Sequence, residues 1–383
     1  GPDISTRFSG PEIRTVLARL GLPALSEGAF DFRATLRNEG DMAQLHIDGG
    51  LGSLYIDADG SLDRLRKPSR GGLRAQAAGP DLAALGAAFG APGLVASPFD
   101  AELTLQFDGP SVVVENAIVS TNHDRLEVEG RISTVREWAG STLDVEFSSD
   151  VVDAWVAPHV TLTGDIGAAA VQGNVAIDEN GQLAIDAQAR ALETSVSMRG
   201  TLGSLTGALS PNLVLELRTD HPPVAGAAFG LVGLPDAPLA IMGPLRFEDG
   251  QVASEGVEIR LGPHTANVAG VVSTGDKLRG SRAEISLRTP DLAALGQLFD
   301  VGDLPAEPLQ LEGAASVEDT GMSFRVDRAE VEGVRLRLDG RIADLNRPAG
   351  IDLEFDLGLP GMSAIARWLP DLPWPDGAVT VRG

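Results

Sequence analysis

The chain has 383 residues, of which 43% are hydrophobic and only 4% aromatic, and its 54 acidic and 30 basic residues give a net charge of −24. This balance excludes a nucleic-acid surface, which needs a basic patch, and argues against electrostatic docking on anionic lipid head groups. There is no cysteine, which excludes disulfides, thiolate metal sites and cysteine nucleophiles. No stretch approaches the roughly 18 apolar residues of a membrane span.

Five glycines, which we call the ladder glycines, recur every 70 residues, and each ends a short alternating stretch such as Arg335–Gly340. Apolar residues stand two and four places before each glycine, and the residues between them are mostly polar. This period of two predicts a β-strand with one apolar and one polar face, and a fixed long period predicts a repeat architecture. The glycines and their preceding pairs are Gly60 (Ile56/Ala58), Gly130 (Leu126/Val128), Gly200 (Val196/Met198), Gly270 (Ala266/Val268) and Gly340 (Leu336/Leu338).

A second set of regularly spaced residues, which we call the second ladder, is out of phase with the ladder glycines. Each of these residues precedes a short segment with a helical pattern. In the clearest one, Thr289 is expected to cap, Pro290 to occupy the first turn and Asp291 to favour the positive end of the helix dipole. Helices of about nine residues are not stable alone in water, so they must lie on another element. The ladder is Pro11, Pro80, Asp150, Asp220, Pro290 and Pro360, and the segment after Asp150 is a poor helix.

Strands follow each helix after a proline-rich turn. In the unit that begins at Pro290, we predict strands at 309–317, 323–330, 334–343 and 351–357, whereas 64–74 reads as a basic, glycine-rich loop. The predicted fold class is mainly β: a repeat array of about 70-residue units, each a short helix plus about four antiparallel strands, forming an elongated, curved sheet with an apolar inner face.

The predicted units form one continuous array, and we interpret the chain as an excised piece of a longer protein. Residues 1–2 are interpreted as a cleavage scar. The predicted boundaries are 3–79, 80–149, 150–219, 220–289 and 290–359, with a truncated sixth unit at 360–383.

The apolar face of such a sheet can adopt one of two arrangements. Four strands present a face on the order of 500 Å², and a nine-residue helix covers roughly a quarter to a third of it. Either the sheet packs on itself and leaves a filled core, or it forms an open trough with an apolar lining that holds an apolar ligand. Periodicity alone leaves both open.

The recurring unit resembles the AsmA-like family of Gram-negative periplasmic proteins, which includes TamB- and YhdP-type bridge-like lipid transport proteins. The resemblance lies in the segment Pro-Asp-Leu-Ala-Ala-Leu-Gly at Pro290–Gly296, the turn at Leu304–Pro308 and the strands that close on the ladder glycine. It implies a β-groove, apolar inside, that crosses the periplasm from an inner-membrane anchor, which is missing from this chain. It also implies that phospholipid acyl chains slide along that groove toward the outer membrane.

Our first hypothesis is therefore a non-enzymatic lipid conduit, with phospholipids or other acyl-chain lipids as partners. The second is a scaffold with a filled β core that docks outer-membrane or other envelope proteins. In the conduit, inward-pointing strand residues contact the acyl chains: Leu103, Leu105, Phe107, Leu126, Val128, Phe147, Leu213, Leu215, Leu217, Ile285, Leu287, Leu336, Leu338, Leu353 and Phe355.

No motif predicts catalysis, a cofactor or a metal. The five histidines show no zinc-binding spacing, and Asp57–Gly60 resembles only the start of a calcium loop. A carboxylate pair for glycan hydrolysis is a minor alternative, because the acidic residues alternate with apolar ones as on a solvated face. Trp368 and Trp374 flank the last helix-to-strand turn and are expected to pack under it.

Overall fold

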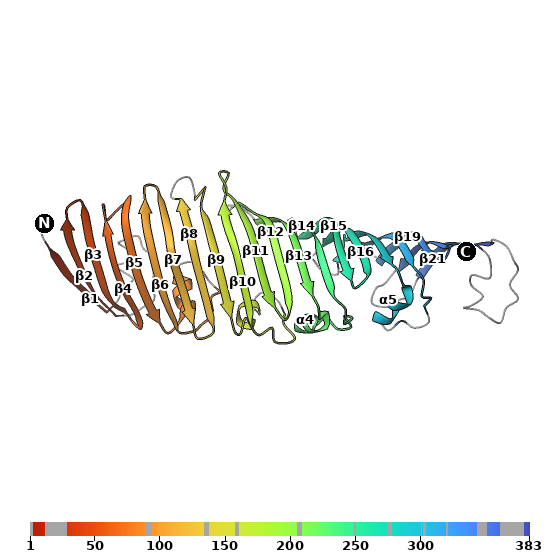
Figure 1. Ribbon diagram of the computed structural model, residues 1–383, viewed down its shortest axis with the longest axis horizontal. Coiled ribbons are helices and arrows are strands. Elements are labelled where there is room, and N and C mark those ends of the chain that lie inside the picture. Colours follow the sequence, from red (N-terminus) through yellow and green to blue (C-terminus); the bar gives the residue numbers. More distant parts are fainter. Residues whose placement is uncertain are drawn as a thin grey trace. The chain divides into compact units, whose positions relative to one another are not determined.

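A computed structural model describes residues 3–11, 29–88, 93–133, 138–157, 161–204, 209–248, 250–273, 278–299, 301, 304–318, 321–342, 351–360 and 379–383. The protein is mainly β, with 22 strands and four short helices in these residues (Figure 1). The chain divides into two compact units. Unit 1 comprises residues 1–192, 204–207 and 228–230, and unit 2 comprises the remainder.

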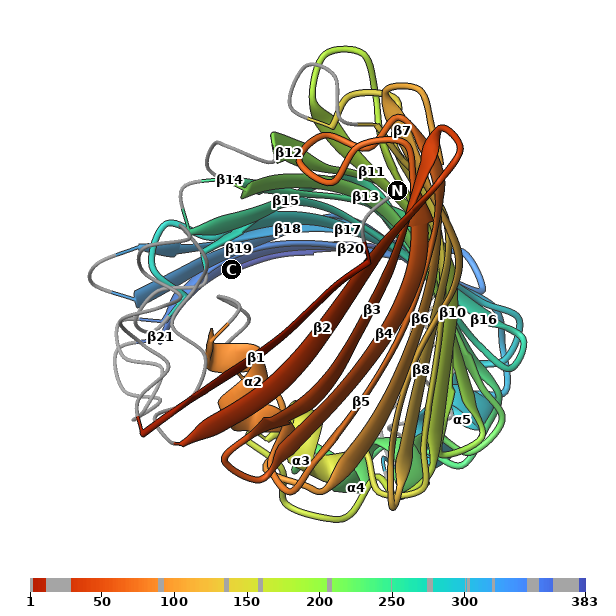
Figure 2. The same ribbon diagram turned by 90° about the vertical axis from the view of Figure 1, so that its left-hand side faces the viewer.

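Unit 1 holds eleven described strands, and each pairs antiparallel with the next along the chain. Helix α2 (Leu82–Ala88) and helix α3 (Asp153–Val156) belong to this unit and lie near the same ends of its strands (Figure 2). The strands are β1 (Ile4–Gly10), β2 (Phe30–Glu39), β3 (Met42–Leu51), β4 (Leu54–Leu62), β5 (Arg70–Gly79), β6 (Phe99–Asp108), β7 (Ser111–Thr121), β8 (Asp124–Ser133), β9 (Thr142–Ser149), β10 (Ala169–Ile177) and β11 (Gln182–Ala191).

Unit 2 repeats this pattern with eleven described strands, again paired antiparallel in chain order. Helix α5 (Leu292–Leu298) lies in this unit, and so does helix α4 (Pro222–Ala228) apart from its last residue. The strands are β12 (Thr194–Ser204), β13 (Leu209–Thr219), β14 (Leu239–Glu248), β15 (Gln251–Leu261), β16 (His264–Ser273), β17 (Arg282–Thr289), β18 (Leu309–Glu318), β19 (Gly321–Val331), β20 (Val334–Ile342), β21 (Ile351–Leu359) and β22 (Val379–Arg382).

The ladder glycines lie inside strands rather than at their ends, which corrects one expectation. Strand β8 continues for three residues past Gly130, and the other ladder glycines also lie inside strands. The predicted loop at 64–74 was likewise wrong from Arg70 onward, because β5 begins there and pairs with both β4 and β6. Gly71 allows this pairing: a Cβ atom there would meet the backbone oxygen of Ser61.

Three strands contain one extra residue near their middle that breaks the alternation. The register shifts between Val114 and Ala117 in β7, between Ser254 and Val257 in β15, and across 326–329 in β19. Such β-bulges leave one residue unpaired and increase the local twist. They let an apolar residue return to the same face of the sheet after three positions instead of two.

The helices begin later than the sequence suggested. Asp291 is the N-cap of α5, and its side chain accepts a hydrogen bond of 2.9 Å from the backbone N–H of Ala294. Thr289, the predicted cap, instead accepts from the backbone N–H of Asp291, so Pro290 precedes the helix. Asp81 accepts in the same way from Ala84 at the start of α2. The helices predicted after Pro11 and Pro360 lie outside the described residues.

Fully buried apolar residues of the described chain are few and gather near the strand ends beside the helices. Phe30 and Leu51, at the start of β2 and the end of β3, form one cluster. Val152, Ile166 and Ala228 form another within unit 1. None of the described helices combines the length and hydropathy needed to cross a membrane. Most of the buried core therefore lies along one end of the strands; Leu62 and Ile177 at the opposite ends, and Val114 and Ala187 at mid-strand, are also buried.

Candidate functional site: the apolar rows

The strand register of unit 1 aligns apolar residues with apolar residues across ten strands, β2 to β11. Directly paired residues point their side chains to the same side of a sheet, so each aligned set forms a row. We call these sets the apolar rows. They are Leu36, Leu45, Gly60, Leu73, Leu105, Val114, Gly130, Leu143, Val175 and Ile185; Ala34, Ile47, Ala58, Ala75, Leu103, Ala117, Val128, Val145, Gly173 and Ala187; and Phe32, Gly49, Ile56, Ala77, Ala101, Val119, Leu126, Phe147, Val171 and Ala189.

Unit 2 carries apolar rows of its own. The longest follows the register through eleven strands without one polar residue: Val196, Leu217, Ile241, Ile259, Ala266, Leu287, Leu311, Ala329, Leu336, Leu357 and Val381. A second runs from β15 to β21 through Val257, Val268, Ile285, Gly313, Val326, Leu338 and Phe355.

The register brings most of the fifteen predicted lining residues together within their units. Leu103, Leu105, Leu126, Val128 and Phe147 belong to the rows of unit 1, and Phe107 is opposite Val112 two residues further along. In unit 2, Leu217, Ile285, Leu287, Leu336, Leu338 and Phe355 belong to the rows just described; Leu215 is opposite Met198, Leu213 opposite Gly200, and Leu353 opposite Gly340.

None of these fifteen side chains is buried. Thirteen are partly exposed, whereas Ile285 and Leu353 are 37% and 48% exposed. In the filled core of a sandwich, the inward residues of central strands would be largely inaccessible. These fifteen residues therefore stay partly accessible within their units, whereas two other row residues of unit 1, Val114 and Ala187, are only 5% and 8% exposed.

The ladder glycines bring neighbouring strands close together within these rows. Gly130 has φ 137°, and a Cβ atom there would lie 2.3 Å from the backbone oxygen of Thr142. The environments of Gly200 and Gly270 are equivalent, with the backbone oxygens of Asn212 and Arg282 at 2.1 Å. Only glycine fits this backbone conformation and this contact, so strand packing requires Gly130, Gly200 and Gly270, whereas Gly60 and Gly340 do not have a positive φ.

Two polar groups on the row side of the sheet, at the strand ends nearest the helices, have polar partners. Asp124 accepts a hydrogen bond of 3.1 Å from the indole N–H of Trp155, whose ring packs edge-on against Phe147. His264 is only 3% exposed, and its Nδ1 lies 2.7 Å from the hydroxyl of Thr289. Desolvation by burial lowers the pKa of His264.

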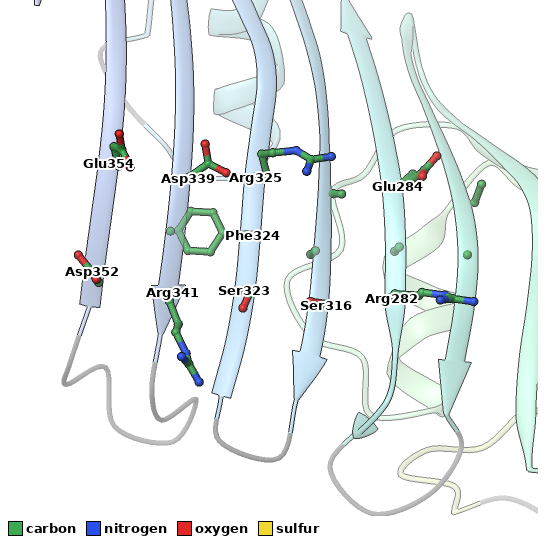
Figure 3. Close-up of a pocket in the computed structure, with 16 residues that line it drawn as sticks. Arg282, Glu284, Ser316, Ser323, Phe324, Arg325, Asp339, Arg341, Asp352 and Glu354 are labelled. Atoms are coloured by element: carbon green, nitrogen blue, oxygen red, sulfur yellow. The ribbon is translucent and has the colours of Figure 1, made fainter. Parts of the chain in front are cut away.

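The described hollows lie mainly against the opposite face of the sheet. The largest, about 730 Å³, is in unit 2 (Figure 3). Its labelled charged and hydroxyl residues alternate with the row residues along β17 to β21, so they face the other way: Arg282, Glu284, Ser316, Ser323, Arg325, Asp339, Arg341, Asp352 and Glu354. Of the fifteen predicted residues, only Phe147 and Ile285 line any of the described hollows, in cavities of about 170 and 360 Å³. The other thirteen predicted residues line none of the described hollows.

Sequence spacing missed one cluster of potential ligands in unit 1, on the face opposite the apolar rows of that unit. His46 of β3 pairs with Asp59 of β4, and its Nδ1 lies 2.8 Å from an Asp59 carboxylate oxygen. Asp57 completes a group whose ligand atoms lie within 4.8 Å of one another. These residues lie on two strands, so a search for motifs along the chain cannot detect them; counting the register across the β3–β4 hairpin can. Trp368 and Trp374 lie outside the described residues.

No protein-family model matches this chain, and no curated protein matches it either.

Proposed function

We propose that the apolar rows bind the acyl chains of lipids, and that the chain is a periplasmic segment of a bridge-like lipid transfer protein that carries phospholipid between the inner and outer membranes. In this proposal, the 70-residue units form a groove with the rows on its inner side. The parent protein is anchored in the inner membrane, and no residue acts as a catalyst.

The observation that supports the proposal is the exposure of the row residues. Leu287 is opposite Ala266 on one side and Leu311 on the other, within the uninterrupted row of unit 2, yet it is not buried. A continuous apolar surface that stays open to solvent is typical of a binding site for an apolar partner. Each methylene that an acyl chain buries there contributes about 0.8 kcal/mol.

The composition of the rows suits sliding. They consist of aliphatic residues, glycine and a few phenylalanines, with no charge or hydrogen-bonding side chain that would fix one position of a chain. Transfer into such a lining depends on area and not on register. The alternative, a scaffold with a filled core, requires the same residues to be inaccessible, and their partial exposure weighs against it.

The experiment compares two substitutions to glutamate on opposite faces of unit 2. Leu287→Glu places a charge in the middle of the longest row, whereas Ser316→Glu places one on the charged face, opposite Arg282. The purified proteins are incubated with vesicles that contain a phospholipid with a fluorescent acyl chain, and bound lipid is measured after separation and by native mass spectrometry. We expect Leu287→Glu to reduce bound lipid several-fold and Ser316→Glu to bind as the unchanged chain does.

Circular dichroism of both variants identifies the competing outcome. Equal lipid binding by Leu287→Glu and the unchanged protein would overturn the proposal. Unfolding of Leu287→Glu alone, together with no lipid bound by the unchanged chain, would support the filled-core scaffold. Leu336→Arg, in the same row, provides an independent repeat with the opposite charge.

A further inference from the structure

Four potential metal ligands form a square on the face of unit 1 opposite the apolar rows. Strand β3 carries His46 and Asp48, and β4 carries Asp57 and Asp59, with His46 opposite Asp59 and Asp48 opposite Asp57. Because residues two apart on a strand point to the same side, all four side chains share one face, while the intervening Ile47 and Ala58 belong to the apolar rows.

The imidazole is held between carboxylates on both of its nitrogens. Nδ1 lies 2.8 Å from Asp59, and Nε2 lies 3.4 Å from Asp48. One imidazole nitrogen and one carboxylate oxygen each from Asp57 and Asp59 come within 4.8 Å of one another. No other group of three such residues meets this condition in the part of the chain that the structure describes.

The charges around the square favour a cation. Three carboxylates surround one imidazole. Arg33 and Arg74 are the cationic residues opposite Asp48 and Asp59 in the register, and they offset part of the negative charge from outside the square. Nδ1 of His46 and the carboxylate of Asp59, 2.8 Å apart, face each other where a metal ion would contact both.

We propose that His46, Asp57 and Asp59 bind a divalent transition-metal ion of the Zn²⁺ or Co²⁺ class, with water completing the coordination. Asp48, 3.4 Å from the second ring nitrogen, would orient the imidazole, as carboxylates do beside metal-bound histidines. An imidazole with two carboxylates suits these ions, whereas Ca²⁺ requires six to eight oxygen ligands and Mg²⁺ a near-octahedral oxygen shell. Binding joins β3 to β4 on the face opposite the apolar rows and is independent of lipid.

The test is a calorimetric titration of the whole chain with ZnCl₂ at pH 7.5, followed by the absorption spectrum of the Co²⁺ form. The matched control is His221→Ala in unit 2. His221 is also an exposed histidine between two carboxylates, with Asp236 at 3.3 Å and Glu193 at 3.7 Å, but it does not belong to a three-ligand group.

We expect one site, weakened at least about tenfold by His46→Ala and by Asp59→Asn and unchanged in His221→Ala. Affinity should fall between pH 7.5 and 5.5, because the ion competes with the proton on His46. Intense visible absorption of the Co²⁺ form should disappear in His46→Ala. A titration that is identical in His46→Ala and in the unchanged chain, or no binding at all, would refute the site and leave the lipid proposal untouched.

Discussion

Replacing Gly130 with alanine tests the packing role of the glycine ladder. The new Cβ would lie 2.3 Å from the backbone oxygen of Thr142 and 2.9 Å from the Cα of Leu143, at φ 137°. Backbone strain of this kind costs about 1–3 kcal/mol, and moving β9 away to relieve the contact loses about another 1 kcal/mol of strand hydrogen bonding. We therefore expect unit 1 to lose about 2–4 kcal/mol of stability.

The matched control is Gly109→Ala in the turn between β6 and β7. Gly109 also has a positive φ, 59°, but a Cβ atom there has nothing within 4 Å, so the substitution should cost only about 1–2 kcal/mol. Urea unfolding followed by circular dichroism, with hydrogen exchange of the β8 and β9 amides, compares the two variants. If Gly130→Ala were no less stable than Gly109→Ala, close strand approach would not be the reason for the ladder.

Three further substitutions test the structural polar groups at the helix end of the strands. Burial lowers the pKa of His264, so the neutral imidazole contributes its full share of the folding stability above about pH 6.5. That stability is lost as the pH falls through the lowered pKa. The urea midpoint should therefore drop more between pH 7 and pH 5 in the unchanged chain than in His264→Leu. Trp155→Phe should cost about 1.5–3 kcal/mol, because it keeps an aromatic ring but removes the hydrogen bond to Asp124, and an Asp124→Asn background should reduce that cost in thermal unfolding. Asp153→Ala removes the acceptor for the backbone N–H of Ile166 at 2.7 Å, so faster exchange of that amide and a loss of about 1–3 kcal/mol are expected; an unchanged exchange rate would contradict this role.

Alternation along single stretches was sufficient to predict several strands of the described chain. The strands predicted at 309–317 and 323–330 occur at Leu309–Glu318 and Gly321–Val331, because apolar residues at every second position leave only one arrangement that buries them on one side. The mainly β fold was therefore predictable. The bulge in β19 was not, since an extra residue is visible only when the partner strand is known.

Two local features were predicted wrongly or missed because they depend on side-chain contacts between separate segments. The cap of α5 was assigned to Thr289, but the hydroxyl of that residue is engaged by His264, a residue 25 positions earlier. The cluster around His46 was missed for the same reason, because its members meet through strand pairing. Both depend on residues that are distant in sequence or on neighbouring strands, which patterns along one segment cannot reveal. Eleven of the fifteen predicted lining residues belong to the apolar rows, but the other row members were not predicted and the partial exposure of the fifteen required coordinates.

The three strands with a bulge near their middle show how the fold accommodates an extra residue that would otherwise move the following side chains to the other face of the sheet. In an alternating strand, inserting one residue sends every later side chain to the wrong side, so a single insertion should be as damaging as a long one. Strands β7, β15 and β19 each contain such an extra residue and still return their apolar residues to the rows, whereas β3 and β11 pair without any shift. The fold can therefore accept one-residue insertions during evolution at the middle of these strands, where the extra residue is left unpaired, and should resist them elsewhere along the same strands.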